Sequence, residues 1–418
     1  MRLGGSRTAF GSLVALLGAA ALAGVPSAQA QESFKIGAPV SSSGRYVAYG
    51  AQGKKGIETA VEMWRKVRGD KVAGRQIEVL FRDTQSNNAI TVSLMNAFIQ
   101  TDKVDVIIGP DGSNVAAAAV PPWKKLENRP IWLMPGGSSD VIEREVGPDP
   151  YFFHTYAWSY YYHDNNVKAL AAALGTKKKV ALLYSDGAYG RAHVDDARKY
   201  IKDAGFDLVL DELVREGSSD YNPTLAKVRA RRPDILYLAV QTNDAIQLTK
   251  QIQAARLNVP YLVGTAQAQL PEWQDAVGDA QVCWTGVTTW VPGLRYPADA
   301  KEPGLFPSAA DWEKMWTAKY NAVPEFLEVG YYASTIMTLL AVEATNSTDR
   351  EKLKEWLEKQ EYQTPLGSSK FEKSRVAMHQ AFGTMVVFQR EKKPDGTFGS
   401  VLLYPEQVAT GKLKPCAS

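Results

Sequence analysis

The stretch Val104-Asp105-Val106-Ile107-Ile108-Gly109 decides the fold class of this chain. Its β-branched residues follow one another without a regular alternation of apolar and polar positions. Such a run predicts a strand buried on both faces, as in a parallel sheet covered by helices. Similar apolar runs alternate with amphipathic segments on either side of it. The sequence therefore predicts an α/β fold.

Two blocks of this alternation are present, at about residues 34–150 and about residues 177–265. Each block predicts a doubly wound, Rossmann-like sheet of its own, with right-handed crossovers and helices on both faces. Strands are predicted at 34–40, 76–82, 104–109, 129–134, 179–185, 206–214, 234–240 and 259–264. Helices are predicted at 51–68, 89–100, 189–204, 223–232 and 243–256.

The last third of the chain is less regular. Helices are predicted at 308–321, 328–345 and 350–359. Strands at 382–390 and 400–403 should form a hairpin around the turn Lys393-Pro394-Asp395-Gly396. The four prolines of residues 292–307 predict an irregular loop.

The N-terminus predicts export. Arg2 and Arg7 precede an uncharged apolar stretch at residues 10–24, and Ala28-Gln29-Ala30 is a small-x-small cleavage pattern. These are the parts of a secretory signal peptide, so we expect residues 1–30 to be removed and the protein to be exported. The apolar run is shorter than the roughly 20 residues that a membrane span needs.

Composition and motifs exclude several function classes. The 48 Lys and Arg residues nearly balance the 45 Asp and Glu residues, so there is no basic footprint for nucleic acid. Gly109-Pro110-Asp111-Gly112-Ser113 lacks the last glycine of a nucleophile elbow, and no nucleotide-phosphate loop occurs. Asp195-Asp196 is expected on a helix surface. We therefore expect a binding protein rather than an enzyme.

Neither metal nor cofactor chemistry is indicated. The four histidines and two cysteines show no metal-ligand spacing. In an oxidising compartment Cys283 and Cys416 could form a disulfide, or they could remain a buried thiol and a C-terminal thiol. The sequence leaves both alternatives open.

Four motifs carry a resemblance to a known family. In their order along the chain they resemble the periplasmic solute-binding proteins of ABC importers, in the leucine/isoleucine/valine-binding (type I) group. The resemblance covers roughly residues 34–389. The motifs are Ile36-Gly37-Ala38-Pro39 with Ser43-Gly44, Ala48-Tyr49-Gly50 and Gly56; Ile108-Gly109-Pro110 with Ser113 and Pro121-Pro122; Met134-Pro135-Gly136-Gly137-Ser138-Ser139; and Tyr184-Ser185-Asp186 with Tyr189-Gly190.

The resemblance implies two lobes joined by three hinge strands, with crossings near Ala157, Thr289 and Phe382. Lobe 1 would comprise residues 31–157 and 289–381, and lobe 2 residues 158–288 and 382–418. Open α/β sheets bind ligands at the carboxyl ends of their strands, so the cleft between the lobes is the expected site.

The resemblance also implies ligand-binding residues. Ser113 matches a serine that holds the ligand carboxylate, although a serine there could also be a plain helix cap. Gly136 and Ser138 match a second loop that grips the ligand head group. Tyr49 and Tyr189 match aromatic residues that close on the ligand from opposite lobes. Phe326 matches a pocket aromatic.

Two positions depart from the family pattern. Amino-acid binders of this family hold the ligand ammonium with an acid after the last second-lobe strand, but Gly264-Thr265-Ala266-Gln267 has none. A family aromatic after the preceding strand is replaced by Gln241-Thr242. An ammonium buried without a counter-charge is costly, so a carboxylate without an amine fits better, unless Asp244 or Asp186 supplies the contact.

The first hinge is unusually aromatic. Residues 151–162 include Tyr156, and their rings could stack on a planar ligand or simply pack the hinge. Tyr156, Gln241 and Thr265 thus complete the set of expected ligand-binding residues.

The function expected from all of this is capture of a small carboxylate, either an aromatic acid or a hydrophobic or branched-chain amino acid, for an inner-membrane ABC permease. The protein should act as a monomer and without a cofactor. A ligand-sensing extracellular receptor module is the alternative. A secreted hydrolase is disfavoured, because no nucleophile constellation is present.

Overall fold

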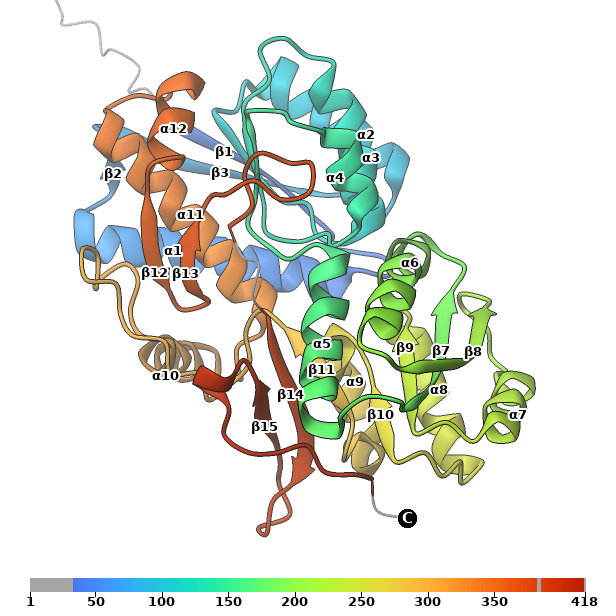
Figure 1. Cartoon of the computed structure of the whole chain (residues 1–418). Helices are drawn as coiled ribbons and strands as arrows, with labels where there is room; N and C mark the ends of the chain where they lie inside the picture. Colours follow the sequence, from blue (N-terminus) through green and yellow to red (C-terminus); the bar gives the residue numbers. More distant parts are fainter. Residues whose placement is uncertain (1–32, 382–384, 417–418) are drawn as a thin grey trace, which may run out of the picture. The chain divides into compact units, whose positions relative to one another are not determined.

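The computed structural model describes residues 33–381 and 385–416 (Figure 1). The predicted signal peptide of residues 1–30 and the hinge position Phe382 lie outside the described residues. Within them, no helix has both the length and the apolar character that crossing a membrane requires.

The first sheet has six strands in the order β2-β3-β1-β4-β5-β6. All neighbouring pairs are parallel except β2 and β3. The deciding stretch of the sequence forms β4, whose Val106 and Ile108 face one core while Ile107 faces the other, so burial on both faces is confirmed. The strands are β1 (Ser33–Val40), β2 (Lys71–Val72), β3 (Arg75–Asp83), β4 (Val106–Ile108), β5 (Ile131–Met134) and β6 (Phe152–His154).

Helices cover both faces of this sheet. Helices α1 and α11 pack against each other on one face, and α2, α3 and α4 pack side by side on the other (Figure 1). We call this sheet with these helices and α12 the first lobe. Its helices are α1 (Val47–Arg68), α2 (Asn88–Asn96, continued by a π-helical segment Ala97–Asp102), α3 (Ser113–Lys124), α4 (Asp140–Val146), α11 (Phe326–Thr345) and α12 (Arg350–Leu357).

The second sheet has seven strands in the order β15-β14-β11-β10-β9-β7-β8. The five strands β7 to β11 are parallel, and β14 and β15 are added as an antiparallel hairpin. The strands are β7 (Lys179–Ser185), β8 (Asp207–Val214), β9 (Ile235–Ala239), β10 (Tyr261–Val263), β11 (Thr285–Thr288), β14 (Val386–Lys392) and β15 (Phe398–Tyr404).

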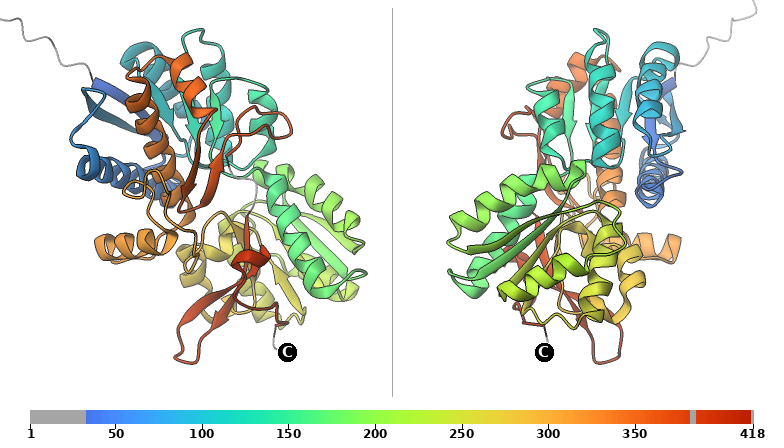
Figure 2. Two further views of the ribbon diagram at one scale, coloured as in Figure 1. Left: turned by 60° about the vertical axis from the view of Figure 1, so that its left-hand side comes forward. Right: turned by 90° about the vertical axis from the view of Figure 1, so that its right-hand side faces the viewer.

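Helices also cover both faces of the second sheet. Helices α5 and α6 pack on one face, and α7 and α8 lie on the other, where α9 packs against α8. We call this sheet with these helices the second lobe. Both views of Figure 2 show its green and yellow elements grouped apart from the blue and cyan ones. Its helices are α5 (Ser159–Leu174), α6 (Ala188–Asp203), α7 (Asn222–Arg231), α8 (Thr242–Ala254) and α9 (Pro271–Val277).

The remaining elements lie in the chain between β11 and β14 of the second sheet. Residues 292–307 form no helix or strand, as the prolines predict. Helix α10 (Ala309–Tyr320) precedes α11, and a small hairpin of β12 (Glu361–Thr364) and β13 (Gly367–Lys370) follows α12. A disulfide joins Cys283 to Cys416, which resolves the alternative that the sequence leaves open.

Two blocks of alternating strands and helices are confirmed, but several elements were not predicted. The largest is α5, which begins inside the aromatic run at residues 151–162. Aromatic residues are poor helix formers, so local propensity hides its first turn. Helix α1 begins at Val47 rather than at residue 51, so Tyr49 is a helix residue. The predicted lobe boundaries of 31–157 plus 289–381 and 158–288 plus 382–418 remain a prediction.

Candidate functional site

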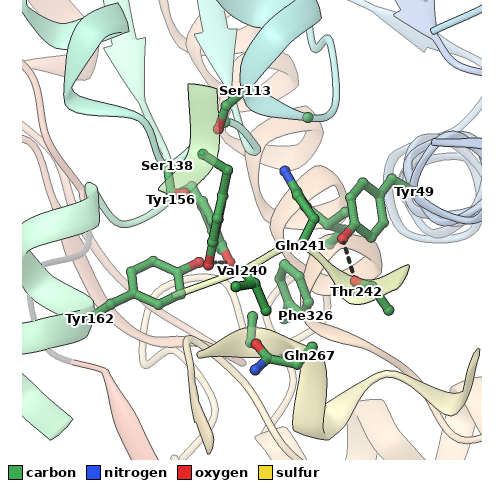
Figure 3. Close-up of a pocket in the computed structure, with 15 residues that line it drawn as sticks. Tyr49, Ser113, Ser138, Tyr156, Tyr162, Val240, Gln241, Thr242, Gln267 and Phe326 are labelled. Atoms are coloured by element: carbon green, nitrogen blue, oxygen red, sulfur yellow. Dashed lines mark hydrogen bonds between the residues drawn. The ribbon is translucent and has the colours of Figure 1, made fainter. Parts of the chain in front are cut away.

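A cleft lies between the two lobes, at the carboxyl ends of both sheets (Figure 3). Its walls come from the loops after β4, β5, β9 and β10 and from the first turns of α1, α5, α6 and α11. The lining residues are Tyr49, Gly112, Ser113, Gly137, Ser138, Tyr156, Tyr162, Tyr189, Val240, Gln241, Thr242, Ala266, Gln267, Phe326 and Leu327.

The structure gathers most of the residues expected from the sequence around this cleft. Tyr49, Ser113, Ser138, Tyr156, Tyr189, Gln241 and Phe326 all line it. Gly136 and Thr265 do not, and their neighbours Gly137 and Ala266 take those places. That the lining residues bind a ligand remains a prediction.

Ser113 is the first residue of α3 and is 5% exposed. Gly112 occupies the N-cap position with φ of 65°, and no side chain caps the helix, so the plain helix-cap role weighed for Ser113 is not the one seen. The Ser113 hydroxyl instead accepts a hydrogen bond from the Ser139 backbone N–H at 3.3 Å. The N–H groups of the first helical turn have no acceptor inside the helix, so hydroxyl and amides together suit an anion.

The loop after β5 forms the second part of this wall. Gly137 has φ of 73°, and a Cβ there would lie 3.0 Å from the Ala116 Cβ, so the loop needs a glycine to lie this close to α3. The turn places the Ser138 hydroxyl 3.3 Å from Nε2 of His193, a second-lobe residue. Ser138 is 4% exposed.

Aromatic rings form the side wall. Tyr156 stacks on Phe326 with a centroid distance of 5.4 Å and an interplanar angle of 19°. The hydroxyls of Tyr156 and Tyr162 are hydrogen-bonded to each other (Figure 3). Burial raises the pKa of Tyr49 to about 12 and those of Tyr156 and Tyr162 well above the usual value, so all three phenols stay protonated at neutral pH.

The second-lobe wall is held by a short polar chain. The Gln267 Oε1 accepts hydrogen bonds from the Thr265 backbone N–H at 2.9 Å and from the Thr265 hydroxyl at 2.6 Å. The Thr265 oxygen in turn accepts a hydrogen bond from the Tyr189 hydroxyl at 2.7 Å. Thr265 therefore lies behind the cleft, where it fixes Tyr189.

Several contacts join the lobes around the cleft. The Tyr49 hydroxyl lies 3.2 Å from Oγ1 of Thr242, the first residue of α8 (Figure 3). Arg45 is paired with Glu216 at 2.9 Å. Arg375 lies in the segment after β13, which is held against α4 by the hydrogen bond from the Val376 N–H to Glu143. It is paired with Asp196 of α6 at 2.8 Å, so Asp196 is a buried ion-pair partner and not the solvated helix residue that the sequence predicted, whereas Asp195 is exposed. The two lobes are thus in contact across the cleft.

No charged side chain is among the residues described as lining the cleft. Asp244, the first candidate for an ammonium contact, accepts hydrogen bonds from the Gly217 N–H at 2.8 Å and the Tyr221 hydroxyl at 2.9 Å. Asp186, the second, accepts from the Glu216 N–H at 2.8 Å. Asp244 lines a neighbouring hollow with Arg45, Glu216 and Glu272, next to Tyr49 and Gln241. Asp186 and the Oδ1 atom of Asp244 are therefore engaged within the second lobe, whereas Oδ2 of Asp244 is buried without a hydrogen-bond partner.

Sequence reasoning missed several lining residues. Tyr162 belongs to the aromatic run but was not singled out, because its place depends on the unpredicted helix α5. Recognising a helix from Ser159 would have placed Tyr162 and Asn166 on one face, four residues apart. Leu327 lies in the first turn of α11 and Gln267 in a short 3-10 helix, Ala266–Gln269, and the sequence gives no local signal that either residue lines the cleft.

Comparison with known proteins gives the family. A family model described as periplasmic binding protein matches residues 33–395. Leu/Ile/Val-binding protein homolog 3 of Brucella melitensis is 26% identical over 340 residues, which cover 79% of this chain and 84% of that protein.

Solved structures share the fold. The branched-chain amino acid transporter substrate-binding protein LivJ from Streptococcus pneumoniae, solved with isoleucine, has a TM-score of 0.74 and 21% identity, covering 90% of this chain and 100% of its own. An ABC transporter solute-binding protein from R. palustris, solved with benzoate, has a TM-score of 0.71 and 22% identity, covering 91% and 100%. The chain belongs to the periplasmic binding protein family and has the two-sheet fold of its type I, leucine/isoleucine/valine-binding group.

Proposed function

We propose that this protein is the substrate-binding component of an ABC importer. It captures a small carboxylate without an amine, an aromatic acid foremost, in the cleft between its lobes. It works in the periplasm after removal of the signal peptide, carries out no catalysis, and passes its ligand to an inner-membrane permease.

The character of the cleft lining is the observation that supports this ligand class most. The lining offers hydroxyls, amides and aromatic rings, and no charged side chain among the described residues. A carboxylate can be held by Ser113, Ser138 and helix N–H groups, since these are hydrogen-bond donors. An ammonium buried in the same space would lack a counter-charge, and such a loss typically costs about 3–5 kcal/mol.

Two structural relatives were solved with ligands of the two classes under consideration, an amino acid and an aromatic acid. LivJ was solved with isoleucine and the R. palustris protein with benzoate. Both ligands carry a carboxylate, and only isoleucine carries an ammonium. The stacked pair of Tyr156 and Phe326 also favours a planar ligand, because aromatic rings pack well in offset or edge-to-face arrangements.

A thermal-shift panel tests the proposal. The mature protein is melted with benzoate, hydroxylated benzoates, aliphatic carboxylates, and leucine, isoleucine and valine. A ligand at 100 times its Kd stabilises the folded state by about 2.7 kcal/mol, which is readily detected. We expect benzoate-type acids to raise Tm more than any amino acid. Stabilisation by branched-chain amino acids alone would contradict the proposed ligand class.

A further inference from the structure

A chain of buried polar groups runs through the second lobe and ends at the cleft. It begins at the Gly264 backbone oxygen, which lies 3.0 Å from Nδ2 of Asn166. The same Nδ2 lies 3.0 Å from the Tyr237 hydroxyl, which lies 2.9 Å from Nδ1 of His163. The last two links join His163 Nε2 to His193 Nδ1 at 2.9 Å and His193 Nε2 to the Ser138 hydroxyl at 3.3 Å.

We call this series of hydrogen-bonded groups the relay, and all of its members are buried. Asn166, His163 and His193 have no exposed surface, and Tyr237 is 1% exposed. Water therefore does not compete for their hydrogen bonds, and each donor needs an acceptor inside the relay. Tyr189 stacks on His193 with a ring-centroid distance of 4.0 Å, and Tyr162 packs edge-on against the same imidazole with a ring-centroid distance of 5.3 Å. The His193 ring therefore lies between two residues that line the cleft.

The carbonyl oxygen at the start sets the direction of the first links. A backbone oxygen can only accept, so the Asn166 atom beside it is the NH₂ group, which donates one proton to Gly264 and one to Tyr237. The Tyr237 oxygen already accepts from Asn166, so its own proton is donated to Nδ1 of His163. If His163 Nδ1 donated to the Tyr237 oxygen instead, the buried Tyr237 hydroxyl proton would have no acceptor, which is unfavourable.

The direction of hydrogen-bond donation continues through the two imidazole rings. Burial lowers the pKa of His163 to about 3 and that of His193 well below the usual range, so both rings are neutral at pH 7. With Nδ1 accepting, the single ring proton of His163 lies on Nε2 and is donated to Nδ1 of His193. The proton of His193 then also lies on Nε2, facing Ser138.

We infer that His163 and His193 are positioning residues that make Ser138 a hydrogen-bond donor toward the cleft. The Ser138 oxygen accepts from His193, so the hydroxyl proton is available to a ligand acceptor. The relay itself follows from the hydrogen-bond geometry and the neutral state of both rings, and it does not depend on the ligand. Its consequence for the ligand rests on the proposed function: a carboxylate oxygen fits this position, and an ammonium does not.

The direct test is the tautomeric state of the two histidines. The chain has only four histidines, so ¹⁵N-histidine labelling with two-bond ¹H–¹⁵N correlation spectra resolves each one, assigned through single His→Gln variants. At pH 7 we expect His163 and His193 to be neutral with the proton on Nε2, with and without benzoate. A proton on Nδ1 of either ring, or a doubly protonated ring, would overturn the relay.

Variants test the consequence for binding. Tyr237→Phe removes the donor to His163 and should abolish the exclusive Nε2–H state of His163 in the same spectra. His193→Phe should weaken benzoate binding about tenfold by calorimetry, whereas His193→Gln, whose amide can still donate to Ser138, should stay within about threefold of the parent. Equal losses in the two His193 variants would overturn the positioning role.

Failure of the relay and failure of the proposed function give different results. If the parent protein does not bind benzoate but both histidines carry their protons on Nε2, the ligand class is wrong and the relay stands. If benzoate binds and the tautomers differ from those expected, the relay is wrong and the proposed function stands.

Discussion

Replacing Ser113 by alanine removes the one side-chain hydroxyl at the N-terminus of α3 that lines the cleft. Under the proposed function this hydroxyl donates to the ligand carboxylate. A hydrogen bond to a charged group contributes about 1.5–3 kcal/mol, which corresponds to a roughly 10- to 150-fold rise in the Kd for benzoate.

The free protein should be affected much less. In the structure the Ser113 oxygen accepts a single long hydrogen bond, 3.3 Å, from the Ser139 N–H. Its loss costs about 1 kcal/mol, or about 2 °C in Tm for a chain of this size. Titration calorimetry with benzoate and a thermal melt without ligand measure the two effects separately.

A matched control is available on the same lobe. Ser93 lies on an exposed position of α2 and donates to the Ala89 carbonyl oxygen, away from the cleft. Ser93→Ala should leave the benzoate Kd unchanged. A Kd for Ser113→Ala equal to that of the parent, with the same melt, would remove Ser113 from the binding site and with it the assignment of the α3 N-terminus as the carboxylate site.

Three further predictions follow from the cleft, the disulfide and a buried histidine. Ala266→Glu adds the acid that the cleft lacks, so calorimetry should show that it binds leucine at least tenfold more tightly, and benzoate at least tenfold more weakly, than the Ala266→Gln control. Unchanged selectivity would refute the argument that a ligand ammonium lacks a counter-charge in this cleft. Replacing Cys283 and Cys416 by serine should lower the free energy of unfolding by about 2–5 kcal/mol in urea and leave benzoate affinity intact, since neither cysteine lines the cleft. Burial lowers the pKa of His154 in the folded protein to about 3, whereas in the unfolded chain it is about 6.5. As the pH falls below about 6.5, the unfolded state binds a proton that the folded state does not bind, so folding stability is lost. Between about pH 6.5 and 5 the free energy of unfolding of the parent should therefore fall by about 2 kcal/mol more than that of His154→Gln. Parallel pH profiles for parent and variant would contradict that prediction.

The sequence predicted the parts of the fold that depend on local patterns. The run at residues 179–185 forms β7 with those bounds, and both blocks of alternating elements form their own sheets. Apolar runs in parallel sheets are buried on both faces, so they stand out from their surroundings. Ser113, Ser138, Tyr49 and Tyr189 also line the cleft, and these four residues were predicted from the family resemblance.

Features that depend on contacts between distant segments could not be predicted in this way. Helix α5 starts in an aromatic run with low helix propensity and forms because Tyr160 and Tyr162 become buried on folding. Gly136 and Thr265 were each placed one residue from a lining residue, because the conformation of the loop decides which side chain faces the cleft. His163 and His193 lie on different helices, His163 contacts both His193 and Tyr237 of β9, and no local spacing links the three.

The measurement closest to the central claim is a pair of calorimetric titrations of the same mature protein, one with benzoate and one with leucine. A cleft lined by hydroxyls, amides and aromatic rings predicts a Kd for benzoate at least tenfold below that for leucine. Sub-micromolar leucine binding together with no heat from benzoate would contradict the account. In that case an acid such as Asp244 would have to turn toward the ligand ammonium.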